Sequence, residues 1–355
     1  MTLPSVLTRR FFASQETGLL IVVTIVVVTL AAAAGSHADR LTGETVNNFL
    51  NSNTLIQVAT DASFFAIMAI GATIVIISGG IDLSVGSIYA LAGVSMALAL
   101  RALGPASQPT IVIVGLVTSL GVGLLCGILN GLLVVGLRVH PFIVTLGTMW
   151  VLRGIAFVAT KAESILVPFQ LTGVTKASLG LRGGLYPVPM LVMIAMTVLG
   201  WLYLTRTVMG RHIFAFGGNI EASRFAGLSL GRIQLGVFAV SGLTAGLAAF
   251  LGASFYGSAS SGDGQGYELY VIAAAVVGGA SLIGGKGSAI GAMLGALLIV
   301  LIRQSIRTLH MDQNYEWIVI GCAIIVAVVI DRWSAGVTSR RLSRSTQLAS
   351  PPVST

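Results

Sequence analysis

The sequence predicts an all-α integral membrane protein with about ten transmembrane helices, and three observations support this fold class. Of the 355 residues, 55% are hydrophobic and only 9% are charged, whereas a soluble domain carries about 25% charged residues. The mean hydropathy is +0.95. The apolar residues are also gathered into blocks close to the ~20 residues that a helix needs to cross the hydrocarbon core.

The first half of the chain is expected to contain five spans. The first follows the basic pair Arg9 and Arg10 and has no convincing cleavage site, so we expect it to be retained as an anchor. The connection 79–83 is so short that we expect a tight hairpin or a re-entrant turn. The expected spans are residues 18–35, 63–78, 84–100, 110–136 and 141–160.

The second half is expected to contain five more spans after the polar stretch 161–187. The Ser- and Pro-rich residues 332–355 predict a disordered cytoplasmic tail. The transmembrane domain is therefore expected over 18–331, after a cytoplasmic segment of residues 1–17. The expected spans are residues 188–205, 233–256, 269–284, 288–303 and 317–330.

The two halves of the chain share a weak internal sequence repeat. The string GGIDLSVGSIYALAG (79–93) resembles GGKGSAIGAMLGALL (284–298) after a gap. Each string follows an apolar block and begins a Gly- and Ala-rich one. Transporters are often built from such repeats, although a shared composition is the alternative explanation.

The basic residues predict that both termini are cytoplasmic. With the amino terminus inside, twelve of the 20 Lys and Arg residues fall in inner segments, seven fall in outer segments, and Arg153 lies within a span. The outer residues Arg303 and Arg307 run against the rule. A nine-span arrangement would move the tail and its four arginines outside, which the same rule disfavours.

The rest of the composition argues against several kinds of site. Cys126 and Cys322 each lie inside an apolar block, so they are expected to be small buried residues, not a disulfide or a metal pair. The four histidines have no ligand spacing, so no metal or cofactor is expected. Basic inner loops explain the net charge of +8, so nucleic acid is not expected as a partner.

The longest predicted inner loop, residues 209–233, has the pattern of a structured element. Residues 217–219 indicate a turn, after which 221–226 are expected to form a short helix. Asn219 can cap the start of this helix and Gly227 can end it. A short helix held under a helical bundle suits docking of a soluble partner; an ordinary solvated loop is the alternative.

The same loop follows a spaced pattern, and ordered motifs surround it. It matches G-R-x-x-[FY]-A-x-G-G-N-x-x-A-[AS]-R-x-x-G at Gly210, Arg211, Phe214, Ala215, Gly217, Gly218, Asn219, Ala222, Ser223, Arg224 and Gly227. Further motifs lie at 79–87, 140–154 and 266–288. Over about residues 63–331 these motifs resemble the ribose-type branch of ATP-binding-cassette (ABC) importer permeases, and the loop resembles the coupling loop of that branch.

The resemblance implies a division of labour among several subunits. Two permease subunits, identical or paralogous, would form the translocation path for a monosaccharide or related polyol in a bacterial inner membrane. Separate cytoplasmic ABC ATPase subunits would grip the coupling loop, residues 206–232, whose short helix includes Glu221. A periplasmic sugar-binding protein would deliver the solute. Which sugar is carried stays open.

The chain itself is not expected to be an enzyme. A phosphate-binding loop requires G-x-x-x-x-G-K-[ST]. Before and after Lys286, Ala280 stands in place of the first Gly and Gly287 in place of the Ser or Thr. Lys286 is therefore expected to lie in a tight inner turn.

Three charged residues near the membrane each have two interpretations. Asp82 is either a gate or a cap that accepts the Ser84 or Val85 amide. Arg153 lies within a predicted span, where a charge costs about 2.5–3.5 kcal/mol, so a functional or pairing role is weighed against a position near the interface. Glu268 is either an acceptor at a sugar entrance or a helix cap.

A sugar path is expected to combine aromatic faces with a few hydrogen-bonding groups. Simple packing inside the bundle is the alternative for each candidate. The candidates for the path are Phe64, Phe65, Asn130, Thr145, Arg153, Glu268 and Gln304.

Two other classes of membrane protein fit the sequence less well. An ion-coupled secondary transporter of a small polar solute needs acidic or His residues deep in its spans, whereas Asp61 and Asp82 are expected at span ends. An intramembrane enzyme needs a paired carboxylate, a Ser/His pair or a metal triad, and none of the predicted spans contains one.

Overall fold

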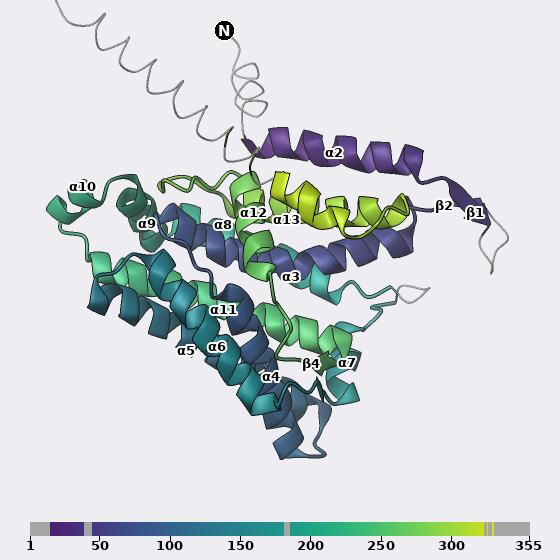
Figure 1. The fold of residues 1–355 in the computed structure, drawn as a ribbon, viewed down its shortest axis with the longest axis horizontal. Helices are drawn as coiled ribbons and strands as arrows, with labels where there is room; N and C mark the ends of the chain where they lie inside the picture. The colour runs from purple at the N-terminus through teal and green to yellow at the C-terminus, as the bar shows by residue number, and fades with distance from the viewer. Residues whose placement is uncertain (1–14, 39–44, 181–184, 323–324, 326–328, 330–355) are drawn as a thin grey trace, which may run out of the picture.

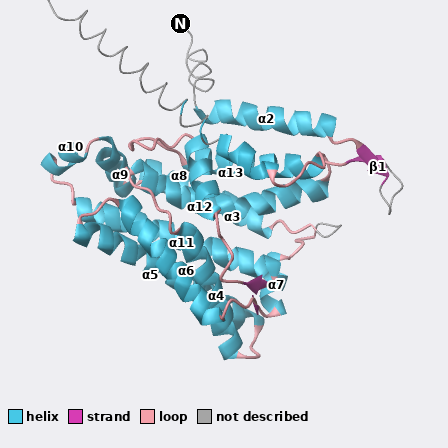
Figure 2. Cartoon of the chain, viewed as in Figure 1, coloured by secondary structure: helices cyan, strands magenta, loops and turns pink. Residues whose placement is uncertain are grey.

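The computed structural model describes residues 15–38, 45–180, 185–322, 325 and 329, which are mainly helical. Figures 1 and 2 show helices throughout, with two short antiparallel strand pairs in the connections. The helices are α2 (Gln15–Ala33), α3 (Ser52–Ile77), α4 (Val85–Leu103), α5 (Gln108–Leu137), α6 (Pro141–Thr160), α7 (Phe169–Thr175), α8 (Val188–Arg206), α9 (Val208–Gly218), α10 (Ile220–Phe225), α11 (Leu230–Tyr256), α12 (Tyr267–Val277) and α13 (Ala289–Thr308). The strand pairs are β1 (Ser36–Ala38) with β2 (Thr45–Asn47), and β3 (Ile165–Leu166) with β4 (Ser258–Ala259).

Eight of the described helices are long and apolar enough to cross a membrane, in agreement with the predicted all-α membrane class. They are α2, α3, α4, α5, α6, α8, α11 and α13. The span predicted at 317–330 lies partly outside the described residues, of which 315–322 are helical. The tails 1–14 and 332–355 also lie outside them. The total of about ten spans and the side of each terminus stay predictions.

Helix α12 is shorter than the sequence predicts. The span expected at 269–284 is wrong, because α12 ends at Val277 after 11 residues. This is about 16 Å of helix, or about half of the hydrocarbon core. Gly279, Gly284 and Gly285 have φ angles of 99°, 97° and 73°, which residues with side chains rarely adopt. The chain therefore turns before α13 starts.

A second helix break lies between α3 and α4, where residues 79–83 form the tight connection that the sequence predicts. The two breaks touch, because the Gly285 amide donates a 2.8 Å hydrogen bond to the Ile77 carbonyl. Inside a membrane, backbone groups freed by a break need partners in the protein. The two similar strings, 79–93 and 284–298, each begin at one of these breaks.

Helix α3 lies at the centre of the bundle, and all of residues 62–77 are buried. Helices α8, α11, α12 and α13 pack around it. In Figure 1, α13 lies between α3 and α2. Helix α6 packs mainly on α4 and leaves Trp150, Val151 and Val158 exposed, so it lies at the edge of the subunit.

Small residues let α5 and α11 approach closely. Ser119, Gly123 and Gly127 follow one another at four-residue spacing on α5, a pattern that favours close helix packing in lipid. A Cβ atom at Gly123 would lie 2.3 Å from the Gly242 carbonyl oxygen, and one at Gly242 would lie 2.1 Å from the Gly123 carbonyl oxygen. The Ser119 hydroxyl also donates a 2.8 Å hydrogen bond to the Gly246 carbonyl.

We expect Gly123→Ala to destabilise the protein by about 1–3 kcal/mol, because the added methyl group forces α5 and α11 apart. The matched control is Gly121→Ala on the same helix, where a Cβ atom would meet nothing within 4 Å. Thermal unfolding of both variants in one detergent measures the difference. Equal melting temperatures would contradict the close contact between α5 and α11.

Candidate functional site

Between the end of α8 and the start of α11, the segment 206–232 forms two helices, α9 and α10, joined at Asn219. The turn predicted at 217–219 is wrong in part, because Gly217 and Gly218 end α9. Asn219 caps α10 as predicted, since its Oδ1 accepts a 2.9 Å hydrogen bond from the Ala222 amide. The segment is therefore structured, as its composition predicts.

The short helix α10 is exposed and projects from the bundle (Figure 1). Gly227 follows it with a φ of 77°, in agreement with its predicted role as the helix end. Ile220 and Phe225 are 47% and 89% exposed although both are apolar. Exposed charged residues of α9 and α10 are Arg211, Glu221 and Arg224. A protruding helix with apolar and charged side chains suits docking to another protein.

Gly217 contacts both helix breaks through its backbone. A Cβ atom here would lie 1.7 Å from the Ile77 carbonyl oxygen and 2.8 Å from the Gly285 nitrogen. At Gly218 a Cβ atom would meet nothing within 4 Å. At Gly210 it would lie 2.4 Å from carbonyl oxygens in the last turn of α8. Helix α9 therefore rests against the bundle through contacts that only glycine allows at Gly210 and Gly217.

Asp82 is buried, with 1% of its surface exposed. Its Oδ1 accepts hydrogen bonds from the Ser84 amide at 2.9 Å and the Ser84 hydroxyl at 2.6 Å. Its Oδ2 accepts a 2.8 Å hydrogen bond from the Ser241 hydroxyl of α11. The Ser84 amide bond is the contact that the cap interpretation expects. The Ser241 bond also ties the α3–α4 break to α11.

Asn130 and Thr145 belong to the same buried cluster. Asn130 Nδ2 donates a 2.7 Å hydrogen bond to Ser84 Oγ. Thr145 Oγ1 donates to the Ile81 carbonyl and accepts from the Leu83 amide, both at 3.1 Å. Both side chains are fully buried, so they hold the α3–α4 connection against α5 and α6.

Arg153 and Glu268 line one cavity of about 630 Å³, which we call the α6–α12 cavity. Its size lies within the range of small-molecule sites, ~300–1,000 Å³. The other lining residues are Met149, Trp150, Phe157, Gln265, Gly266 and Trp317. The cavity thus combines two indole rings, an amide and two opposite charges.

Arg153 fixes the connection between α11 and α12, because its Nη1 donates to the Ser261 carbonyl at 2.8 Å and to the Asp263 carbonyl. Burial raises the pKa of the Asp263 carboxyl, while a hydrogen bond from the Ser260 amide and the charge of Arg153 act to lower this pKa. Glu268 Oε2 is buried and has no hydrogen-bond partner among the described residues. This oxygen lies close to Gly86 of α4, so Glu268 also packs against the start of that helix.

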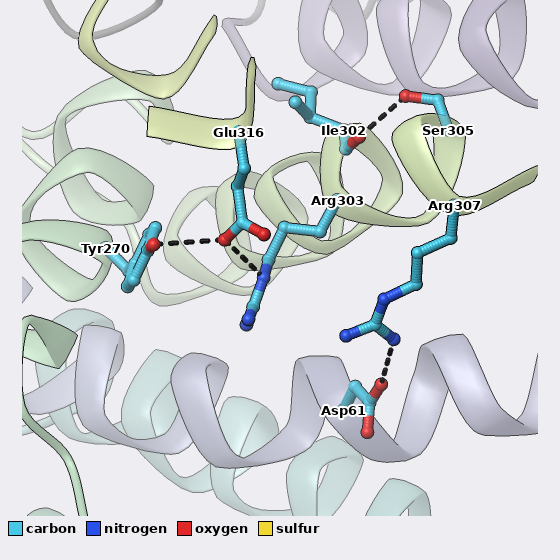
Figure 3. Close-up of polar contacts among 7 residues, drawn as sticks. All are labelled: Asp61, Tyr270, Ile302, Arg303, Ser305, Arg307 and Glu316. Atoms are coloured by element: carbon cyan, nitrogen blue, oxygen red, sulfur yellow. Dashed lines mark hydrogen bonds and ion pairs between the residues drawn. The ribbon is translucent and has the colours of Figure 1, made fainter. Parts of the chain in front are cut away.

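Figure 3 shows the contacts of the two arginines that run against the positive-inside rule. Arg303 Nε lies 2.7 Å from Glu316 Oε1, which also accepts a 3.0 Å hydrogen bond from the Tyr270 hydroxyl. Arg307 Nη1 lies 3.8 Å from Asp61 Oδ2. Arg303 therefore has a short contact to a partly buried carboxylate, and the more exposed Arg307 has a long one.

The other predicted path residues do not line the α6–α12 cavity. Phe64 packs against two aromatic rings at the end of α11. Phe65 lies under the Arg303 guanidinium, which is 5.6 Å from the ring centroid. Gln304 Nε2 donates a 3.2 Å hydrogen bond to Thr308 Oγ1. The structure thus brings together only Arg153 and Glu268 in this cavity, and Asn130 and Thr145 around Asp82.

Several residues at these sites have no local signal in the sequence. Ser241 reaches Asp82 from a helix far along the chain. Trp150 and Trp317 come together only in the folded cavity. Phe225 does not stand out in the sequence either, since its loop also contains Phe214 and Phe216. Its exposure of 89% in the fold identifies it.

We expect Ser241→Ala to lower stability by about 1–3 kcal/mol, because it removes a hydrogen bond to a buried carboxylate. Ser87→Ala is the control, since Ser87 is equally buried but its hydroxyl has no partner within the described part of the chain. Thermal unfolding in detergent compares the two variants. An equal loss of stability in the two variants would contradict a specific stabilising role for the hydrogen bond between Ser241 and Asp82.

Comparison with known proteins places the chain among membrane transporters. A family model described as "Branched-chain amino acid transport system / permease component" matches residues 54–328. The ribose import permease protein of Haemophilus influenzae is 37% identical over 287 residues, which cover 81% of this chain and 87% of the relative.

Two further relatives are similar over most of the chain. The fructose import permease protein of Rhizobium meliloti is 32% identical over 290 residues, covering 80% of this chain and 79% of the relative. A probable ABC transporter permease protein of Sinorhizobium fredii is 37% identical over 274 residues, covering 76% of this chain and 78% of the relative. Because the family model and these relatives match most of its length, the chain belongs to the family of transport-system permease components.

Proposed function

We infer that the chain is the membrane-spanning subunit of an ABC importer for a monosaccharide or a related polyol. The observation that carries this proposal is similarity over about four-fifths of the chain to permeases named for ribose and fructose import. The family description names branched-chain amino acids, so an amino acid is the alternative substrate. An ion-coupled secondary transporter has no comparable support.

A cytoplasmic ABC ATPase is the proposed partner of α9 and α10. Helix α10 offers the exposed Ile220 and Phe225 to such a partner. A displacement of α10 would be transmitted through α9 to both helix breaks, since Gly217 of α9 packs against the Ile77 carbonyl and Gly285. This geometry supports a mechanical role for the segment 206–232.

The α6–α12 cavity is proposed as part of the solute path. Arg153, Gln265 and Glu268 supply hydrogen-bonding groups, and Trp150 and Trp317 supply ring faces. These are the groups that recognise a hydroxyl-rich solute. Because α6 lies at the edge of the subunit, a second permease, identical or paralogous, would close the path on this side.

The proposed setting is a bacterial inner membrane, with α9, α10 and both termini in the cytoplasm. The excess of basic residues in the inner segments supports this orientation. The solute would be delivered by a periplasmic binding protein at the opposite face, where α3 begins.

Gly217→Ala is expected to reduce the ratio of transported solute to hydrolysed ATP several-fold, because the added methyl group collides with the Ile77 carbonyl and displaces α9. Gly218→Ala is the matched control, because a Cβ atom there would meet nothing within 4 Å. Proteoliposomes with the ATPase and the binding protein give both rates. The same ratio in the two variants would remove the case for coupling through Gly217.

The importer function is tested by purification and uptake. We expect the chain to copurify with an ABC ATPase, and we expect sugar uptake to stop when the phosphate-loop lysine of that ATPase is replaced. Accumulation of solute by the chain alone, driven by an ion gradient, would favour the secondary-transporter alternative. Uptake of valine or leucine instead of sugars would replace the proposed substrate.

A further inference from the structure

A second concavity, of about 350 Å³, lies between the beginning of α3, the end of α11 and the segment that leads into α8. We call it the α3–α11 pocket. It shares no lining residue with the α6–α12 cavity. Gln57 on its wall is twenty residues from Ile77 along α3, about 30 Å of helix. The pocket therefore lies far from the contact between α3 and α9.

One wall of the pocket is a polar stripe on α3. Asn53, Gln57 and Asp61 are four residues apart, so they lie on one helix face. The side-chain amides of Asn53 and Gln57 have no hydrogen-bond partner within the described part of the chain. These amides offer donors and acceptors to a ligand.

The Asp61 carboxylate still has acceptor capacity. Its Oδ1 accepts a long 3.4 Å hydrogen bond from the Tyr256 hydroxyl, and its Oδ2 lies 3.8 Å from Arg307 Nη1. A carboxylate has about four acceptor sites, and contacts of this length are weak. Arg307 offsets the charge without saturating the oxygens (Figure 3). The site therefore suits neutral hydroxyl donors better than anions.

The pocket also has an aromatic part, which adjoins the polar stripe where the Tyr256 hydroxyl meets Asp61. The rings of Phe255 and Tyr256 are 5.4 Å apart and perpendicular, so they form a corner. Tyr186 lies edge-on to Phe255 at 6.3 Å. All three rings line the pocket. Aromatic rings beside amides and a carboxylate match a sugar, which has apolar C–H faces and an edge of hydroxyl groups.

We propose that the α3–α11 pocket binds one neutral monosaccharide or polyol at the end of the permease opposite α9 and α10. The choice of a sugar over other hydroxyl-rich solutes rests on the proposed function. The volume, near the lower end of the range for small-molecule sites, suits a single ring. The polar stripe and the aromatic corner make this site a binding element of the permease itself, separate from the binding protein.

Saturation-transfer NMR tests the pocket directly. The probes are ribose, fructose and myo-inositol, with valine as a contrast, and the sample is the permease–ATPase complex in nanodiscs without binding protein. We expect transfer to at least one of the sugars or myo-inositol and none to valine. The double variant Asn53→Ala/Gln57→Ala should weaken this binding about tenfold or more, since it removes two hydrogen-bonding groups. Leu55→Ala, an exposed side chain of α3 outside the pocket, is the control.

The outcomes distinguish a failure of the pocket proposal from a failure of the proposed importer function. Both variants change exposed side chains, and an unchanged basal ATPase rate confirms that the complexes are intact. Equal binding by the double variant and the control, or no transfer to any of the three polyols, would overturn the pocket even if binding-protein-dependent import is normal. Binding that depends on Asn53 and Gln57 in a complex that imports no sugar would keep the pocket and reject the proposed function.

Discussion

Backbone groups freed at a helix break must find partners inside the protein, since the hydrocarbon core offers no water. In this molecule one hydrogen bond, from the Gly285 amide to the Ile77 carbonyl, joins two breaks. It links the end of the central helix α3 to the turn between α12 and α13. Gly217 packs on the same carbonyl, so the position of α9 and α10 depends on this junction as well.

Glycine acts here at particular contacts, and its effect differs between neighbouring positions. A Cβ atom at Gly217 would collide with carbonyl and amide groups, whereas one at Gly218 would point into open space. On α5, a Cβ atom at Gly123 would collide with the backbone of α11, whereas one at Gly121 would meet nothing within 4 Å. Close helix packing in lipid relies on van der Waals contact, and a methyl group at a backbone contact removes it. Glycine therefore matters at such contacts and at turns with positive φ angles, such as Gly279 and Gly284.

Polar and charged side chains in the bundle connect segments that are distant in sequence. Asp82 binds Ser241 of α11, and Arg153 binds carbonyl groups before α12. Because burial of an unpaired charge is unfavourable, these contacts stabilise the breaks and connections on which the cavities are built. Glu268 differs, since its Oε2 has no partner among the described residues. Glu268 also lines the α6–α12 cavity, although this oxygen itself is buried.

The sequence by itself determined the membrane class, most helix positions, the cap of α10 and the family resemblance. Hydropathy, capping and motif spacing are local properties, so they can be read without the fold. Only the tertiary structure decided that α12 stops at Val277, that Asn130 and Thr145 are buried around Asp82, and that Arg153 and Glu268 share a cavity. In a bundle where nearly every span is apolar, hydropathy cannot tell which face meets protein and which meets lipid. Contacts between distant segments make that choice.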